Sequence, residues 1–159
     1  MRFQIRAVPS SPLHFGSEGG GQTRSVVVTD EAGNSATFTT VAINIDFTAP
    51  AISISPSLPS LWPPNNKIVA DAISGQITDG GSGIATATYN VVDEYGAIEP
   101  GGPVTIGAAG YSFTLMLEAS RRGDDPDGRT YQVVITVTDR AGNTFTTSTI
   151  VSVPHDQGQ

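Results

Sequence analysis

A seven-residue segment occurs twice in this 159-residue chain, and the spacing of its copies sets the size of the folding unit. Residues 28–34 read VTDEAGN, and residues 137–143 read VTDRAGN. The offset is 109 residues (137 − 28), which is the length of a whole β-domain rather than of a hairpin. We therefore expect one complete repeat between the copies and only part of an earlier repeat before the first.

The segments around both copies alternate between apolar and polar residues, which is the period of a β-strand. The clearest alternation runs over residues 131–138, from Tyr131 to Val137 on one face. Short segments of this kind, separated by turns rich in glycine, proline and aspartate, recur between residues 48 and 154. The pattern predicts an all-β fold, an immunoglobulin-like antiparallel β-sandwich of about seven strands.

Tyr131 gives this prediction a specific test. It lies two positions before the apolar residue Val133 on the penultimate expected strand. In immunoglobulin-like sandwiches a tyrosine at this position forms the tyrosine corner, whose hydroxyl bonds to backbone upstream in the chain. We therefore expect a structural role for Tyr131 rather than a catalytic one.

The domain boundary is expected in residues 44–50 (NIDFTAP). Pro50 cannot donate to a strand ladder and biases the residue before it towards an extended conformation, so the joint should be short and stiff. The expected organisation is the C-terminal half of a first immunoglobulin-like repeat, a complete repeat and a tail, which occupy residues 1–47, 48–154 and 155–159.

The N-terminal part is too small to close a sandwich. It offers a possible strand at residues 3–7 and a hairpin of residues 25–29 with residues 35–45, and residues 16–21 are expected to be a loop. Three strands leave an apolar face uncovered. We therefore expect residues 1–47 to pack on the second domain or on another copy of the chain, which predicts a homodimer through this part.

Charge and composition exclude several classes of partner. The formal net charge is −7, with no basic stripe to neutralise phosphates, so no nucleic acid is expected. There is no cysteine, so disulfides and thiolate chemistry are absent. No apolar run reaches the ~20 residues that span a bilayer, and residues 1–6 do not begin a signal peptide. We expect no membrane span, and the signal of an exported parent protein would lie outside this chain.

Three stretches together resemble bacterial extracellular immunoglobulin-like repeats. They are residues 19–50, which contain the first AGN turn, residues 61–67 (LWPPNNK), and residues 128–157, which contain the second. Asn66 stands where the resembling repeats carry histidine. The resemblance implies a secreted or cell-surface module that serves as a spacer, an adhesion unit or an appendage of a secreted enzyme, with neighbouring repeats as partners.

Acidic loops are the candidate cation sites. Asp124, Asp125 and Asp127 lie within four residues, and Asn44 and Asp46 lie at the expected joint. Ca²⁺ takes six to eight oxygen ligands, and loops of this kind supply carboxylates and carbonyls. We therefore predict Ca²⁺ as the one candidate cofactor, bound in the 124–127 loop or at the joint.

Two further aspartates have a competing interpretation. Asp30 and Asp139 open the two repeated turns, where an aspartate side chain ordinarily accepts hydrogen bonds from turn amides. We prefer this structural role to cation binding for the pair.

Trp62, the only tryptophan, carries the main alternative function. If exposed, its ring could stack on the apolar face of a sugar, as in a carbohydrate-binding module of a secreted enzyme with a polysaccharide partner. If buried, it would close one end of the sandwich, with Pro63 and Pro64 fixing the entry of the chain. The resemblance of residues 61–67 to the family segment implies the packing role, and both roles stay open.

Catalytic residues are not indicated. His14 and His155 are the only histidines, and neither a G-x-S-x-G elbow nor an H-E-x-x-H motif occurs. We therefore expect a non-catalytic structural or adhesion module. A small hydrolase (a glycosidase or esterase) on an immunoglobulin-like scaffold is the second alternative, after the carbohydrate-binding module.

Overall fold

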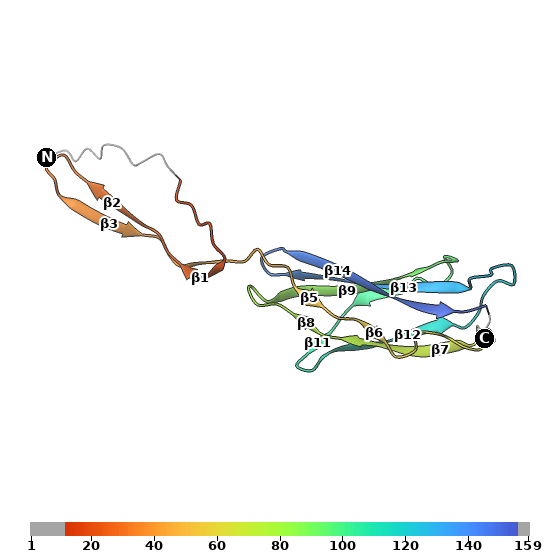
Figure 1. Ribbon diagram of the computed structural model, residues 1–159. Coiled ribbons are helices and arrows are strands. Elements are labelled where there is room, and N and C mark those ends of the chain that lie inside the picture. The colour runs from red at the N-terminus through yellow and green to blue at the C-terminus, as the bar shows by residue number, and fades with distance from the viewer. Residues whose placement is uncertain (1–11, 156–159) are drawn as a thin grey trace. The chain divides into compact units, whose positions relative to one another are not determined.

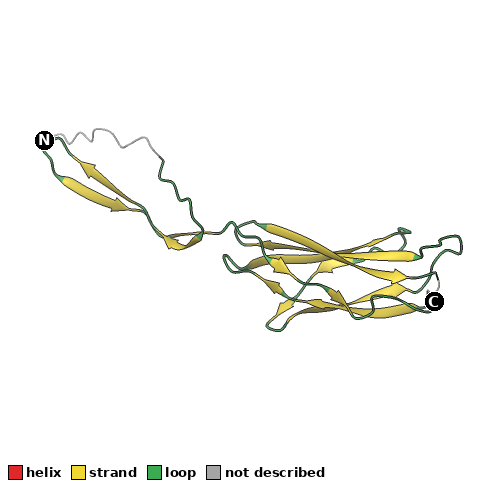
Figure 2. Cartoon of the chain, in the orientation of Figure 1, coloured by secondary structure: helices red, strands yellow, loops and turns green. Residues whose placement is uncertain are grey.

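The computed structural model describes residues 12–155, and every regular element in that range is a β-strand (Figure 2). The chain divides into two compact units, residues 1–47 and residues 48–159. The all-β class predicted from the alternation is confirmed.

The second unit contains five long strands and five short ones. In chain order they are β5 (Ala51–Ile52), β6 (Ser55–Pro56), β7 (Ile68–Gly75), β8 (Ile77–Thr78), β9 (Ile84–Asp93), β10 (Gly101–Pro103), β11 (Ile106–Gly107), β12 (Gly110–Glu118), β13 (Arg129–Asp139) and β14 (Thr144–Val153). Some short strands continue a long one after a break, as β8 continues β7 after Gln76.

These strands form a two-layer sandwich (Figure 1). One sheet has the order β10-β9-β13-β14 and the other the order β11-β12-β7-β6, with every neighbouring pair antiparallel. Strands β5 and β8 form a separate short ladder. The core lies between the sheets, where Ile73 and Leu117 of one sheet and Val133 and Ile135 of the other are fully buried. The immunoglobulin-like sandwich is therefore confirmed.

Two buried tyrosines connect strands to backbone elsewhere in the sandwich. The Tyr131 hydroxyl donates to the Glu118 carbonyl oxygen at 2.9 Å, which confirms the tyrosine corner. The Tyr111 hydroxyl donates to the Ser53 carbonyl oxygen at 2.7 Å. Burial raises the pKa of each phenol to about 12, so both hydroxyls remain donors at neutral pH.

The first unit is described by two short ladders. They are formed by β1 (Gly19–Gln22) with β4 (Ile43–Ile45) and by β2 (Ser25–Thr29) with β3 (Ser35–Thr39). The expectation of a loop over residues 16–21 is wrong for residues 19–21, because they belong to β1, which pairs with β4. The possible strand at residues 3–7 lies outside the described residues.

The repeated segment folds in the same way in both units. Thr29 pairs with Ser35 in the first hairpin and Thr138 pairs with Thr144 in the second, so both partners are shifted by 109 residues (138 − 29 and 144 − 35). The side-chain hydroxyls of each pair are hydrogen-bonded, at 2.7 Å and 2.9 Å. The sequence repeat is therefore also a repeat of strand register.

The turns of the two hairpins share the same hydrogen bonds. The Asn34 backbone N–H donates to Asp30 Oδ1 and its side-chain amide donates to Asp30 Oδ2, at 2.8 and 2.9 Å. Asn143 donates to Asp139 in the same two ways, each at 2.8 Å. The interpretation of both aspartates as acceptors for turn amides is confirmed.

Candidate functional sites

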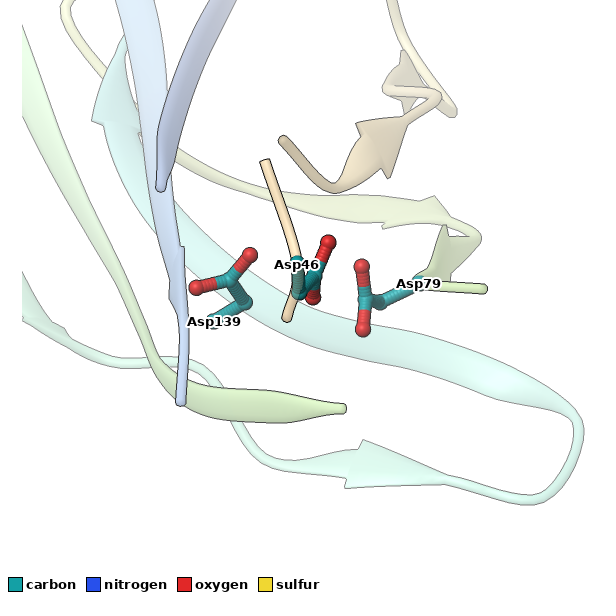
Figure 3. A group of neighbouring side chains, drawn as sticks. All are labelled: Asp46, Asp79 and Asp139. Atoms are coloured by element: carbon teal, nitrogen blue, oxygen red, sulfur yellow. The ribbon is translucent and has the colours of Figure 1, made fainter. Parts of the chain in front are cut away.

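Two carboxylates approach each other at one end of the second unit. Asp79 follows directly after β8, and Asp139 is the last residue of β13. Each offers a carboxylate oxygen within 4.8 Å of the other (Figure 3). Asp46, also drawn there, belongs to the unit of residues 1–47. Two negative groups this close repel unless a cation or a proton lies near them.

Asp79 is held by its own loop. Its Oδ2 accepts the backbone N–H groups of Gly81 and Gly83, and Gly83 has a left-handed φ of 81° that lets the chain fold back over the carboxylate. Its Oδ1 is buried and has no hydrogen-bond partner among the described residues. This orphan oxygen is the feature of the pair that suits a hard cation.

Asp139 is almost fully buried and keeps its two oxygens in the turn hydrogen bonds from Asn143. A carboxylate oxygen has more than one lone pair, so these bonds do not prevent it from ligating an ion. The sequence missed Asp79 as a partner of Asp139. The loop that Asp79 organises leads directly into β9, and Asp139 pairs with Ile84 at the start of β9, so the strand pairing brings the two carboxylates together.

The predicted joint residues lie in the first unit. Asn44 is in β4, and its side-chain oxygen accepts the Gly21 backbone N–H at 2.8 Å. Asp46 follows β4 by one residue. Their assignment to a cation site stays a prediction.

The predicted acidic loop lies at the other end of β13. Asp124 and Asp125 line a shallow, open depression together with Glu94, Tyr95 and Arg122. The Tyr95 hydroxyl donates to Asp125, and this hydrogen bond lowers the pKa of the Asp125 carboxyl. Asp127 also interacts with Asp125. The loop brings its carboxylates to one side of Tyr95, and its assignment to a cation also stays a prediction.

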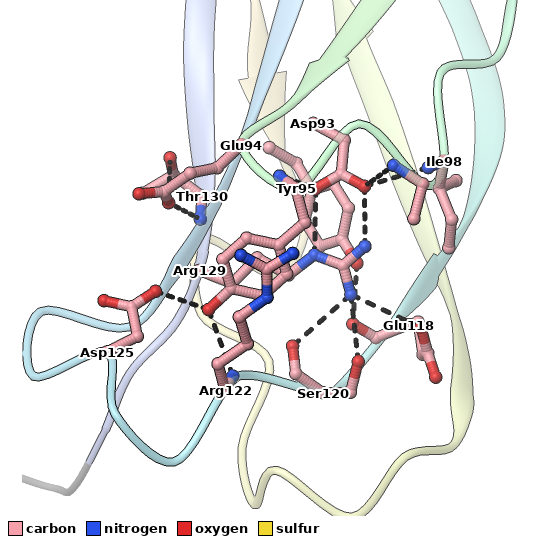
Figure 4. A network of polar contacts seen from close by, with 12 residues as sticks. Asp93, Glu94, Tyr95, Ile98, Glu118, Ser120, Arg122, Asp125, Arg129 and Thr130 are labelled. Carbon is pink, nitrogen blue, oxygen red and sulfur yellow. Dashed lines mark hydrogen bonds and ion pairs between the residues drawn. The ribbon is translucent and has the colours of Figure 1, made fainter.

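Beneath this loop lies a buried ion pair that the sequence did not reveal (Figure 4). Arg129 donates through Nε to Asp93 Oδ1 at 2.9 Å and through a terminal nitrogen to Oδ2 at 2.6 Å. The side chains of Arg129 and Asp93 are 2% and 0% exposed. The second terminal nitrogen reaches the Ser120 hydroxyl at 2.9 Å and Glu118 at 3.3 Å. The planar guanidinium is thus satisfied on both sides.

Asp93 also organises the turn that follows β9. Its oxygens accept the backbone N–H groups of Tyr95, Ala97 and Ile98 at 2.8 to 3.1 Å. Burial raises the pKa of the Asp93 carboxyl, but the bonds from Arg129 and from these three amides outweigh burial, so the pKa lies well below its usual range. The hydrogen bonds to Asp93 in turn raise the pKa of Arg129. Asp93 is therefore a charged structural acceptor.

Aromatic rings and arginines alternate above this pair. The Arg129 guanidinium lies 4.6 Å from the Tyr131 ring and 4.9 Å from the Tyr95 ring, and Arg122 covers the Tyr95 ring at 4.3 Å. Each contact places a cation over a π-face. These contacts form a stack that runs from the core to the surface in the order Tyr131, Arg129, Tyr95 and Arg122. The stack stabilises this end of the sandwich.

Trp62 does not fill the role that the sequence favoured. Its side chain is 43% exposed, whereas the preceding residue, Leu61, is buried in the core. The packing interpretation is therefore wrong for Trp62. The exposed ring is compatible with the ligand-stacking alternative.

The two histidines belong to different units. His14 lies in the first unit, where its carbonyl oxygen accepts the Arg24 side chain at 3.2 Å. His155 lies in the second unit, and its carbonyl oxygen accepts Arg121 at 2.9 Å.

Comparison with protein families gives one match. The model of a family described as bacterial Ig-like domain matches residues 65–155, which is 91 of the 159 residues and includes every strand from β7 to β14. The chain belongs to the bacterial Ig-like domain family. Comparison with curated proteins finds no match.

Membership agrees with the resemblance seen in the sequence. Bacterial Ig-like domains are generally non-catalytic structural or adhesion modules and are often extracellular. The matched range contains the Asp79–Asp139 pair and the Asp93–Arg129 ion pair, whereas Trp62 and the joint lie before it. Within residues 12–155 of this bacterial Ig-like protein, no helix is long and apolar enough to cross a membrane.

Proposed function

We propose that this chain is a spacer or adhesion module of a secreted or surface-exposed bacterial protein, and that neighbouring repeats of the same kind are its partners. The observation that carries the proposal is the repeat of register: the hairpins β2–β3 and β13–β14 share pairings and turn hydrogen bonds at an offset of 109 residues. Tandem copies of one domain are the usual construction of a spacer, because each copy adds a fixed length.

The two units have different places in this proposal. In this proposal residues 48–154 are the complete repeat and residues 1–47 are the C-terminal half of a preceding one, whose hairpin β2–β3 corresponds to β13–β14. The LWPPN segment near the start of the complete repeat and the D-x-A-G-N turn near its end are the sequence features by which further copies would be recognised.

We further propose that Ca²⁺ stiffens the module at the Asp79–Asp139 end. Two features support an ion there: two carboxylate oxygens within 4.8 Å, and a buried oxygen on Asp79 without a hydrogen-bond partner among the described residues. Calcium prefers such oxygen ligands and tolerates irregular geometry. This proposal prefers the Asp79–Asp139 end to the 124–127 loop, which the sequence suggested as a cation site.

Titration calorimetry with CaCl₂ tests the ion site directly. We expect binding heat with the wild-type chain and a fall in affinity of about tenfold or more in Asp79→Asn, which keeps the size of the side chain but removes its charge. The triple variant Asp124→Asn/Asp125→Asn/Asp127→Asn is the matched control, since it removes three charges from the other end and should bind as the wild type does. At a calcium concentration of about 100 Kd, the ion should stabilise the chain by roughly 2.7 kcal/mol.

The variants separate the possible locations. Loss of binding in the triple variant alone would place the ion in the 124–127 loop, and an additional loss in Asp46→Asn would show a contribution from the joint. Absence of both binding heat and any melting shift with EDTA would exclude calcium binding and leave the spacer function unaffected.

Stiffening is measured by energy transfer between dyes attached to the variants Thr37→Cys and Gln132→Cys. The dyes attach only at these positions, because the chain has no cysteine of its own. If calcium does not narrow the distribution of distances between the two dyes, the proposal that calcium stiffens the chain is contradicted.

The exposure of Trp62 supports carbohydrate binding as a second candidate function. An accessible indole can stack on a pyranose, and Trp62 is the only tryptophan, so its fluorescence reports on its own environment. If the chain binds an insoluble polysaccharide, we expect Trp62→Ala to lose the pull-down and Tyr89→Ala, an aromatic change elsewhere, to retain it. Unchanged emission across a panel of polysaccharides would exclude this function.

A further inference from the structure

Residues 57–61, which we call the crossover, pass from one sheet of the second unit to the other. The crossover begins beside β7 of the sheet β11-β12-β7-β6, where the Ser57 N–H donates to the Ala72 carbonyl at 2.8 Å. It ends beside β14 of the other sheet, where Ser60 and Ser152 form an isolated parallel bridge. The crossover therefore joins the first part of the second unit to its last strand.

A buried aspartate attaches the crossover to β7. Asp71 is fully buried, and its Oδ1 accepts the Ser57 hydroxyl at 2.7 Å and the Leu58 backbone N–H at 2.9 Å. The Ser57 hydroxyl oxygen in turn accepts the Ala72 N–H at 3.1 Å. The other oxygen of Asp71 is buried without a hydrogen-bond partner among the described residues. Detachment of the crossover would leave both oxygens of Asp71 unpaired until water reaches them, which is costly.

Backbone hydrogen bonds attach the other end of the crossover to β14. The Leu61 N–H donates to the Ser152 carbonyl at 2.8 Å, and the Ser152 N–H donates to the Pro59 carbonyl at 3.0 Å. The Leu61 side chain is 2% exposed and belongs to the core. Freeing this end therefore breaks two hydrogen bonds and exposes a core side chain to water at the same time.

The parallel direction of the bridge decides how tension on the chain acts on it. The chain enters the second unit ahead of the crossover and leaves it after β14, so tension pulls the crossover backwards and β14 forwards. Because the two segments run in the same direction, these pulls are opposite and lie along the strands. The hydrogen bonds of the bridge are then loaded together in shear, whereas those of a hairpin pulled open break one after another.

We propose that the crossover is a tension-bearing strap, which keeps the second unit folded when the chain is pulled from its two ends, and that Asp71 is its anchor. This inference rests on the proposed function, because a spacer or adhesion module carries tension along the chain. It also gives Asp71 a role that equilibrium stability does not explain, since a buried carboxylate with an unpaired oxygen is costly. An apolar side chain would avoid that cost but could not hold Ser57 and Leu58.

Force spectroscopy tests the strap on the full chain, tethered through a cysteine added at each end, because the chain has none of its own. Ser57→Ala removes the hydroxyl that Asp71 and Ala72 share. We expect the rate of unfolding under constant load to rise about tenfold, which corresponds to ~1.4 kcal/mol of the barrier. Tyr131→Phe is the matched control, since it removes a buried hydrogen bond of 2.9 Å, to Glu118, outside the crossover. It should change the rate under load much less.

Urea unfolding without load separates resistance to force from stability. Forced unfolding follows the unfolding rate under load, so the two variants should lose similar unfolding free energy and differ only when pulled. Equal acceleration by the two substitutions overturns the proposal, because resistance then reflects general stability. An unchanged rate in Ser57→Ala overturns it as well.

The point of attachment gives a second measurement that needs no change in the crossover. A chain tethered through Lys67→Cys and its C-terminal end leaves the crossover out of the loaded path, because residue 67 follows it. We expect faster unfolding than with both ends tethered, and an equal rate would contradict the strap. That failure would leave the proposed function standing, since a spacer can hold domains apart without resisting force. A parent protein that stays inside the cell would contradict the spacer function without changing these rates.

Discussion

Arg129→Met is expected to cost the second unit about 3 to 5 kcal/mol of unfolding free energy. The change removes the cation and leaves Asp93 buried, with only the turn amides to compensate its charge. The Tyr131 and Tyr95 rings also lose the guanidinium between them. Because whole domains of this size are stable by only ~5–15 kcal/mol, urea unfolding followed by Trp62 fluorescence should show a large shift of the midpoint.

The matched control is Arg122→Met, which removes an exposed arginine from the outer face of the same Tyr95 ring. We expect it to cost less than about 1 kcal/mol, since an exposed cation–π contact is weak. Equal effects of the two substitutions would show that buried pairing does not determine stability here. Arg129→Lys, which keeps the charge without the two-pronged hydrogen bond, should fall between them and remains measurable if the methionine variant does not fold.

The Asp93–Arg129 ion pair also predicts how the unfolding free energy of the second unit falls at acidic pH. The pKa of Asp93 is lower in the folded chain than its ordinary value of 3.8, so its contribution is complete above that pH and is lost as the pH falls towards the folded pKa. Wild-type unfolding free energy should therefore be flat from neutral pH to about 5 and fall below about 4. The fall should be shallower in Arg129→Met, because that variant no longer holds the carboxylate ionised through the guanidinium.

The sandwich could be predicted because the strand with the clearest alternation, residues 131–137, has an apolar or aromatic residue at every second position. The alternation that identifies Tyr131 to Val137 also extends one step further at each end, to Arg129 and Asp139, and both are buried. The prediction counts only Tyr131 to Val137 on this face and assigns Asp139 to the turn, so it misses the buried charge of Arg129. The partner of Arg129 could not have been found this way, because the pairing of β13 with β9 depends on contacts between residues 36 positions apart.

Three other features were not predicted from the sequence, each for a different physical reason. Strand β1 consists mainly of glycine, which gives no alternation to detect, and only its ladder with β4 reveals it. The resemblance of residues 61–67 favours a packed Trp62, yet the smaller Leu61 beside it is the buried residue. The Asp79–Asp139 pair combines two loops whose separation in sequence is 60 residues (139 − 79), so composition alone directed attention to the denser acidic loop at residues 124–127.

Gly75→Ala is expected to destabilise the second unit by about 2 to 4 kcal/mol, although it adds a single methyl group. A Cβ atom at Gly75 would lie 1.9 Å from the Ser53 carbonyl oxygen and 2.8 Å from the Tyr111 hydroxyl. The carbonyl must therefore move away from the hydroxyl that donates to it. The Ser53 N–H bond to the Gln76 carbonyl, at 2.9 Å, is strained by the same movement. Thermal and urea unfolding measure the loss.

A double-mutant cycle separates this close approach from a general intolerance of alanine. Gly123→Ala is the control, because a Cβ atom there meets nothing within 4 Å, and its effect should stay within about 0.5 kcal/mol. Tyr111→Phe should cost about 1 kcal/mol in the wild-type chain, where it removes the bond to Ser53. In the Gly75→Ala background that bond is already broken, so the same substitution should cost markedly less. Additive effects would mean that the Ser53 carbonyl keeps its place and that the methyl group is accommodated by movement of β7 instead.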